Sequence, residues 1–208
     1  MNVDFYFDPS CPYCWVTSRW LLMVSNQRDL TINWRLFSLA FKNGELEKDQ
    51  AMSEYYYLHA HRVERVMLAA AKQGASLTSL YTTFGIKHFI SGDEYTDEII
   101  KSSLEQLKLD PSMLRYADDK SLDSDIIAST NEALAIVGGD IGVPTIVFTN
   151  KTGKKLGYFG PVILTLPEID EAVEMWDGLV KLVDNPYLYE LKRGRPESGP
   201  DVFSTSKC

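Results

Sequence analysis

The sequence is poor in cysteine, in basic residues and in long apolar runs. It holds only three cysteines in 208 residues, which excludes a scaffold held by several disulfides. Lysine and arginine number 21 against 29 acidic residues, so the net charge is −8 and nucleic acid is not an expected partner. No uninterrupted apolar run approaches the roughly 18 residues of a membrane-spanning helix. We therefore expect no membrane partner either.

The N-terminal residues lack the pattern of an export signal. The chain begins Met1-Asn2-Val3-Asp4, with neither a basic region nor a long apolar stretch, although a mature chain without its signal would have the same pattern. Hydrophobic residues make up 45% and charged residues 24%, which is typical of a globular protein. Because two of the few cysteines lie three positions apart, we expect functional thiols in a cytoplasmic protein.

Hydrophobic periodicity predicts a small α/β sheet that is interrupted by helices. The N-terminal third indicates a strand over 3–7, a helix from Cys11 to about Ser25 with Ser10 as N-cap, and a strand over 31–37. Strand signal is almost absent until Gly138, whereas helical spacing is frequent. It then returns as strands over 143–149 and 155–159, joined by a turn and followed by a last helix. The order is thus β-α-β, several helices, then β-hairpin-α.

This order suggests how the chain is divided. We expect residues 1–38 and 139–186 to form one discontinuous domain, because both halves are needed to complete the sheet. Residues 39–138 form an all-helical insertion and residues 187–208 form a C-terminal tail, in which we expect Arg193 to Cys208 to be a loosely held loop. We expect the insertion to contact the sheet through a smaller and more polar surface than a core, and to move with redox state.

The motif Cys11-Pro12-Tyr13-Cys14 carries the strongest functional signal. It follows a strand and begins a helix, where free backbone N–H groups and the helix dipole favour a thiolate. Two sulfurs at this spacing can form a small disulfide, so Cys11 would attack a substrate and Cys14 would resolve the mixed disulfide. The alternatives are a pair of buried cysteines or half of a zinc site. A structural zinc site needs four ligands and the chain has no second such motif, so we expect no metal.

A proline inside an apolar strand marks a second position of interest. Val143-Pro144 would remove a ladder hydrogen bond from the strand over 143–149. A cis peptide bond at a strand edge would explain this choice. Beside a redox-active cysteine pair, such a loop can offer the backbone of Val143 to an extended substrate. A turn or an ordinary edge strand is the alternative.

These motifs together resemble the thioredoxin superfamily, and the helical insertion before Val143-Pro144-Thr145 resembles its DsbA-like branch. Within that branch, several short runs are similar to the cytosolic actinobacterial DsbA-like proteins that work with mycothiol: Asp8 to Trp15, Ser18-Arg19-Trp20, Ser38-Leu39-Ala40 and Tyr189 to Arg193. The resemblance implies a thioredoxin-like fold and a reductase of disulfide or electrophilic substrates. It implies mycothiol or a similar low-molecular-weight thiol as cosubstrate, with no tightly bound cofactor.

The sequence departs from two relatives of this branch. Secreted DsbA oxidants carry a histidine between the cysteines, and Tyr13 in its place favours a reductase over a strong oxidant. Kappa-class glutathione transferases and chromene-carboxylate isomerases share the insertion but carry serine at the position of the first cysteine, so Cys11 argues against that class. A kappa-like thiol transferase or isomerase remains one alternative, and a non-catalytic chaperone-type binding protein remains another. Redox cycling with a thiol reductant would separate them.

Several further residues are candidates for substrate contact. Pro12 and Tyr13 lie within the motif, where the tyrosine ring could stack on a substrate. Asn43 follows the second strand and would reach the cleft by analogy with the family; otherwise it is a turn residue before Gly44. Trp15 is expected to pack in the core.

Overall fold

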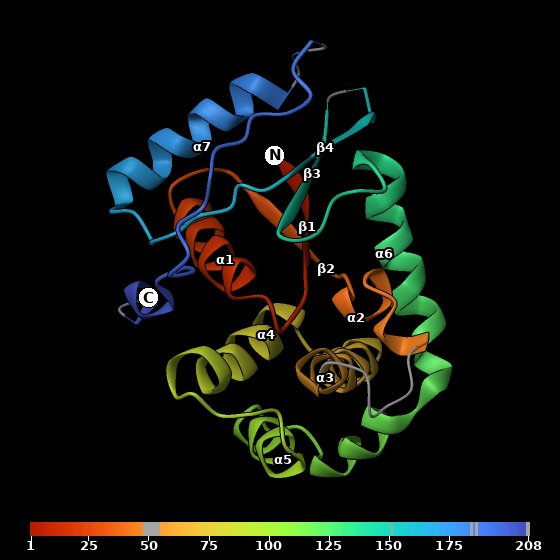
Figure 1. The fold of residues 1–208 in the computed structure, drawn as a ribbon. Coiled ribbons are helices and arrows are strands. Elements are labelled where there is room, and N and C mark those ends of the chain that lie inside the picture. Colours follow the sequence, from red (N-terminus) through yellow and green to blue (C-terminus); the bar gives the residue numbers. More distant parts are fainter. Residues whose placement is uncertain (48–54, 151, 184, 186, 207–208) are drawn as a thin grey trace.

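A four-stranded mixed sheet forms the centre of the protein. The computed structural model describes residues 1–47, 55–150, 152–183, 185 and 187–206 (Figure 1). The strand order is β2-β1-β3-β4, with β1 parallel to β2 and antiparallel to β3, and β3 antiparallel to β4. The strands are β1 (Asn2–Phe7), β2 (Thr31–Leu36), β3 (Thr145–Thr149) and β4 (Lys155–Phe159). The alternation in the sequence therefore predicted each strand to within two residues at either end.

Helices cover both faces of this sheet. One face carries α1 (Pro12–Ser25) and α7 (Ile169–Val183), which contact each other, and Trp20 Nε1 of α1 donates to the carbonyl of Ala172 at 3.0 Å. The other face carries α6 (Asp123–Val137), which contacts β2, β3 and β4 (Figure 1). Within the described residues, no helix has both the length and the apolarity to cross a membrane.

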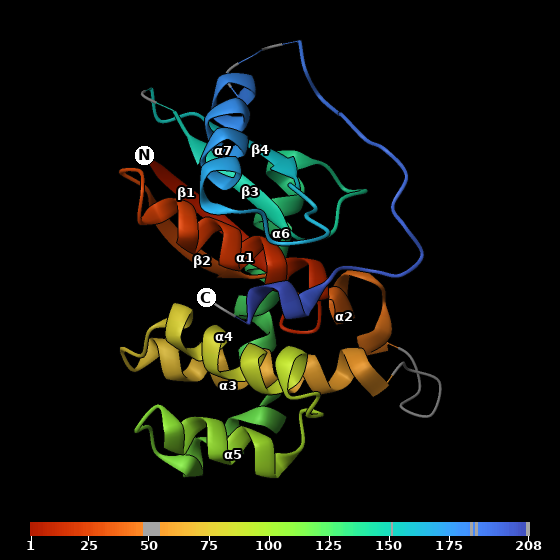
Figure 2. The same cartoon turned by 90° about the vertical axis from the view of Figure 1, so that its left-hand side faces the viewer.

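The remaining helices form a layer below one end of the sheet (Figure 2). They are α2 (Leu39–Lys42), η1 (Glu45–Glu47), α3 (Tyr55–Lys72), α4 (Leu77–Gly85), the π-helical η2 (Ile86–Ile90), α5 (Asp97–Gln106), and the 3-10 segments η3 (Pro111–Asp118) and η4 (Lys120–Leu122). Serine, threonine or aspartate side chains cap several of these, including Ser76 for α4 and Thr96 for α5. The fold is therefore the expected α/β class with a helical insertion.

The interface between this layer and the sheet is apolar and aromatic. The ring of Tyr81 on α4 lies 4.2 Å from that of Phe7 and 5.9 Å from that of Trp34, measured between centroids. One continuous cluster of buried side chains includes residues of both parts. The expectation of a smaller, polar contact is wrong, because the end of β1 carries aromatic residues that require an apolar cover. A redox-dependent movement of the layer stays a prediction.

The proposed boundary at residue 138 falls at the end of a helix that belongs to both parts. The helix α6 contacts α3 and η4 in the helical layer as well as three strands of the sheet. Ser129 Oγ donates to the carbonyl of Leu36 at 2.7 Å, and the backbone N–H of Ser38 donates to Thr130 Oγ1 at 3.0 Å. The division into 1–38 with 139–186 and 39–138 stays a prediction.

The C-terminal tail is held at its end. After α7 the chain runs in an extended path along one side of the molecule and returns between α1 and α4 (Figure 2). There the backbone N–H of Asp201 donates to the carbonyl of Leu164 at 2.7 Å, and Val202–Thr205 form the 3-10 segment η5. Thr205 is buried. The expectation of a loosely held tail is therefore wrong for residues 201–206, because these residues fill a gap beside α1.

Candidate active site

The loop between β1 and α1 is fixed by one buried carboxylate. Asp8 Oδ1 accepts hydrogen bonds from the backbone N–H of Ser10 at 2.7 Å and from its hydroxyl at 2.5 Å. Asp8 Oδ2 accepts from the backbone N–H of Leu39 at 2.7 Å. The N-cap of α1 is Cys11, not Ser10 as the sequence suggested, because the Ser10 hydroxyl is bound to Asp8. The first cysteine therefore stands at the N-terminus of α1.

The two sulfurs differ in access. Cys11 is 8% exposed and Cys14 is 0% exposed, and both are free thiols. The Cys11 thiol donates to the carbonyl oxygen of Val143 at 3.6 Å, across 132 positions of sequence. The Val143–Pro144 peptide bond is cis, and the carbonyl of Pro144 accepts from the backbone N–H of Gly160 at 2.7 Å. The fold thus brings the cysteine motif and Val143-Pro144 together.

The environment of Cys14 keeps its thiol protonated. Burial raises the pKa of Cys14 well above its ordinary value, and the adjacent Cys11 raises it further. A buried, protonated thiol of this kind is a poor nucleophile at neutral pH. It therefore reacts mainly with a disulfide that is held next to it. The site therefore contains two buried cysteines, of which Cys11 keeps slight exposure and Cys14 has none.

The other candidate residues lie at different distances from this centre. Pro12 occupies the first turn of α1, where its missing N–H costs no helical hydrogen bond. Tyr13 is partly buried, and the guanidinium of Arg195 lies 5.2 Å from the centre of its ring. Asn43 is exposed at the C-cap of α2, before Gly44 with φ of 70°. That is the position of a turn residue, and a contact between Asn43 and substrate stays a prediction.

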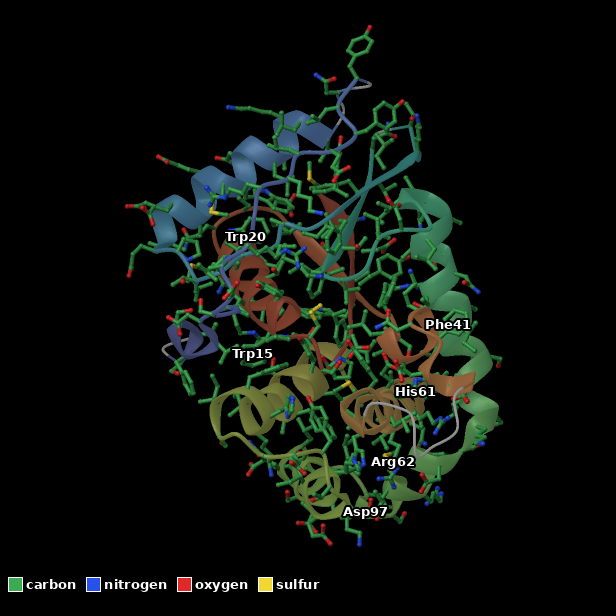
Figure 3. The ribbon with its side chains drawn as sticks, viewed as in Figure 1. Trp15, Trp20, Phe41, His61, Arg62 and Asp97 are labelled. Carbon is green, nitrogen blue, oxygen red and sulfur yellow. The ribbon has the colours of Figure 1, made fainter. Side chains whose placement is uncertain are left out.

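Trp15 fixes the position of α1 against the helical layer and the tail (Figure 3). Its side chain is 2% exposed, as expected for a core residue, and its ring stacks on that of Phe89 at 5.6 Å between centroids. The guanidinium of Arg19 lies 4.2 Å from the ring centre. The indole N–H donates to Thr205 Oγ1 at 2.8 Å. The residue that directly follows Cys14 is thus held by η2, by the end of the tail and by a side chain of its own helix.

Two tyrosines of the helical layer reach this site, and no sequence pattern distinguishes them. The Tyr95 hydroxyl donates to the carbonyl of Pro9 at 2.9 Å. The Tyr81 hydroxyl is buried and has no hydrogen-bond partner among the described residues. Burial raises the pKa of Tyr81 well above its ordinary value, and the nearby Cys14 and Cys11 raise it further. Tyr81 comes from α4, whose spacing alone indicated ordinary packing, and Tyr95 comes from the segment between η2 and α5.

A buried polar network lies behind the loop that contains Asp8. His61 Nδ1 is 2.7 Å from Glu64 Oε2 and 2.9 Å from Ser38 Oγ, and His61 Nε2 is 3.0 Å from Asp123 Oδ1. Figure 3 shows His61 on α3. Burial raises the pKa of Glu64 to about 7, and the negative charge of Asp8 adds to this effect. Titratable groups in the core thus extend from the helical layer to the cysteine loop.

Solved structures of known proteins share this architecture. Among solved structures, the cytosolic disulfide reductase DsbM from Pseudomonas aeruginosa superposes with a TM-score of 0.60 at 14% identity, covering 88% of this chain and 100% of that one. DsbM has also been solved with GSH. The probable DsbA oxidoreductase from Streptomyces coelicolor gives a TM-score of 0.57 at 15% identity, covering 96% and 97%. These structures establish a DsbA-like thioredoxin fold.

Sequence comparison defines the family more narrowly. Rv2286c, an uncharacterized protein of Mycobacterium tuberculosis, is 29% identical over 203 residues, which are 97% of this chain and 84% of that protein. The family model Rv2466c-like, described as mycothiol-dependent nitroreductase Rv2466c, matches residues 10–193. That match includes the cysteine motif, the helical insertion and Val143-Pro144, and the chain therefore belongs to the Rv2466c-like family of mycothiol-dependent nitroreductases.

Proposed function

We propose that the protein is a thiol-disulfide reductase in which Cys11 attacks and Cys14 resolves. The asymmetry of the two sulfurs is the observation that carries this proposal. Cys11 lies at the N-terminus of α1 within reach of the Val143 carbonyl, whereas Cys14 is fully buried with a raised pKa. Membership in a mycothiol-dependent family supports thiol oxidoreductase chemistry.

The reaction consumes one disulfide and two molecules of thiol cosubstrate. The Cys11 thiolate attacks one sulfur of the substrate, the S–S bond breaks, and the first thiolate leaves. Cys14 then loses its proton and attacks the Cys11 sulfur, which releases the second thiolate and leaves a Cys11–Cys14 disulfide. One cosubstrate thiol opens this disulfide by attacking Cys11, and a second removes the first as its own disulfide. Two electrons thus pass from two cosubstrate thiols to the substrate.

The walls of the site position the substrate beside Cys11. In this proposal the backbone of Val143 and the ring of Pro144 form one wall, and Pro12 and Tyr13 form the other. The Val143 carbonyl accepts a hydrogen bond from the Cys11 thiol at 3.6 Å. An extended substrate that pairs with this backbone would carry its disulfide into line with Cys11. Asn43 would contact the substrate or cosubstrate at the outer edge.

We infer that the cosubstrate is mycothiol or a similar low-molecular-weight thiol, and that the protein works in the cytoplasm. The family description supports mycothiol, and the GSH complex of DsbM, a cytosolic disulfide reductase, supports a small thiol. A cytoplasmic location fits a reductase, because reducing thiol pools keep the resting enzyme as a dithiol. The proposal requires no metal and no tightly bound cofactor.

Trapping the mixed disulfide tests the assignment of roles. In a Cys208→Ser background, Cys11→Ser should abolish turnover of a model disulfide with mycothiol. Cys14→Ser should accumulate a mixed disulfide on Cys11, or keep partial activity if a second mycothiol resolves it. Peptide mass spectrometry after treatment with mycothiol disulfide locates the adduct. In the Cys208→Ser protein, which keeps both Cys11 and Cys14, an adduct on Cys14 instead of Cys11 would reverse the two roles.

The same assay separates the alternative functions. A kappa-like transferase would join mycothiol to an electrophile without forming a Cys11–Cys14 disulfide, and it would keep activity in Cys14→Ser. A chaperone-type protein would bind unfolded chains equally well in the Cys11→Ser variant. Replacing mycothiol by glutathione, or by thioredoxin as electron donor, identifies the reductant by its turnover rate.

A further inference from the structure

The C-terminal tail crosses the face that contains the cysteine motif. The Tyr158 hydroxyl on β4 donates to the carbonyl of Leu188 at 2.8 Å, and the backbone N–H of Asp201 donates to the carbonyl of Leu164 at 2.7 Å. Between these two attachments, residues 189–198 are exposed. We call residues 189–200 the strap. Figure 2 shows this segment outside the body of the molecule before the chain returns beside α1.

One arginine of the strap lies over both walls of the site. The guanidinium carbon of Arg195 is 5.2 Å from the ring centre of Tyr13, which lies between the two cysteines. It is also 5.5 Å from the ring centre of Phe159, the last residue of β4. The next residue, Gly160, donates its backbone N–H to the carbonyl of Pro144. Arg195 thus joins the motif side of the site to the side of Pro144.

The donors of this guanidinium are available to a ligand. Two aromatic rings hold the group by cation–π attraction, which leaves its N–H groups unused. In the part of the chain that the structure describes, no ion pair or hydrogen bond of Arg195 is present. The strap also carries Lys192 and Arg193 against Glu190 and Glu197, so its net charge is +1 in a protein whose net charge is −8.

We propose that Arg195 forms an anion-binding subsite that selects disulfide substrates carrying a carboxylate a few bonds from the sulfur. A planar guanidinium binds a carboxylate through two parallel N–H···O bonds, a geometry that a lysine ammonium cannot reproduce. Because the rings of Tyr13 and Phe159 orient the group, less rotamer freedom is lost on binding. This inference rests on the proposed attack by Cys11.

Single-turnover kinetics of the reduced protein test the subsite without requiring a full catalytic cycle. In the Cys208→Ser background, the second-order rate constant of Cys11 is measured with two aromatic disulfides. Dithiobis-nitrobenzoate carries a carboxylate on each ring, and dithiodipyridine is uncharged. The variants are Arg195→Gln, Arg195→Lys and the matched control Arg193→Gln, which removes the same charge from the same exposed strap.

A selective loss is the expected result. Arg195→Gln should slow the reaction with the dicarboxylate about three- to tenfold and change that with the uncharged disulfide less than about twofold. Arg195→Lys should recover part of the lost rate constant with the dicarboxylate. In the wild-type protein, the ratio of the rate constant with the dicarboxylate to that with the uncharged disulfide should fall as salt is added. Arg193→Gln should leave both rates within about twofold of wild type.

Three outcomes would overturn the proposal. Equal slowing of both reagents by Arg195→Gln would mean that the arginine only holds the strap in place. Equal effects of Arg193→Gln and Arg195→Gln would mean that a diffuse field, not a subsite, attracts anions. Unchanged rates in all variants would mean that Arg195 does not meet the substrate. If both reagents react with Cys11 but no thiol sustains turnover, the proposed reductase function fails while the subsite is still measured.

Discussion

Replacing Gly85 with alanine should destabilise the protein through a single side chain. A Cβ at this position, the last residue of α4, would lie 2.3 Å from Cζ3 and 2.5 Å from Cε3 of Trp15. Carbon atoms in contact normally stand about 3.5–4 Å apart. Alanine would cause no backbone strain here, because Gly85 has φ of −68° and ψ of −35°, which any residue adopts. The whole penalty must therefore come from displacing the indole.

Trp15 has little room in which to move. Its ring stacks on Phe89, the guanidinium of Arg19 lies over it, and its N–H donates to Thr205 Oγ1 at 2.8 Å. Overpacking a filled core costs roughly 1–3 kcal/mol, and leaving a buried donor unpaired costs about 1–3 kcal/mol. Alanine gains up to about 1 kcal/mol over glycine in a helix. We therefore expect Gly85→Ala to lower the free energy of unfolding by about 2–4 kcal/mol.

Gly178→Ala is the matched control for this experiment. Gly178 lies within α7, is exposed, and would place its Cβ in open space. The same substitution should there raise the free energy of unfolding by about 0.5–1 kcal/mol, because only helix propensity changes. Urea unfolding followed by far-UV circular dichroism compares the two variants. Equal stability of Gly85→Ala and wild type would refute the packing around Trp15 described above.

Three further predictions concern buried polar groups. Thr205→Val leaves the indole N–H of Trp15 without an acceptor, so the free energy of unfolding should fall by about 1–3 kcal/mol in urea; no change would mean that the end of the tail is not held there. Burial raises the pKa of Glu64 from 4.5 to about 7, so its contribution to stability is complete below about pH 4.5 and is lost as the pH rises through about 7. Glu64→Gln should therefore flatten the decline in stability between about pH 5 and 8, and an unchanged slope across urea titrations would contradict this. Tyr81→Phe removes a buried hydroxyl that has no hydrogen-bond partner among the described residues, so the thermal midpoint should rise, by an amount corresponding to about 1 kcal/mol; a lower midpoint would show that the hydroxyl has a stabilising partner.

Local sequence determined the elements of this protein and the position of its candidate reactive thiol. Alternating apolar residues such as Val3, Phe5 and Phe7 specify strands, because successive side chains of a strand point to opposite faces. A strand that ends at Asp8-Pro9, followed by a cysteine pair three apart, places a thiol at a helix N-terminus. The strands and the position of this thiol depend only on spacing along the chain, so both can be predicted without knowing which residues lie nearby in space.

The tertiary structure alone decided what surrounds that thiol. Cys11 meets the carbonyl of Val143 across 132 positions of sequence, and Trp15 meets Thr205 across 190. The tail was expected to be loose, and the helical layer was expected to have a polar contact with the sheet. The first is wrong for residues 201–206 and the second is wrong for the contact around Tyr81, because periodicity shows which face of an element is apolar but not which distant segment covers it. The position of Arg195 over Tyr13 has the same origin, since only the path of the folded chain brings a tail residue to the cysteine motif.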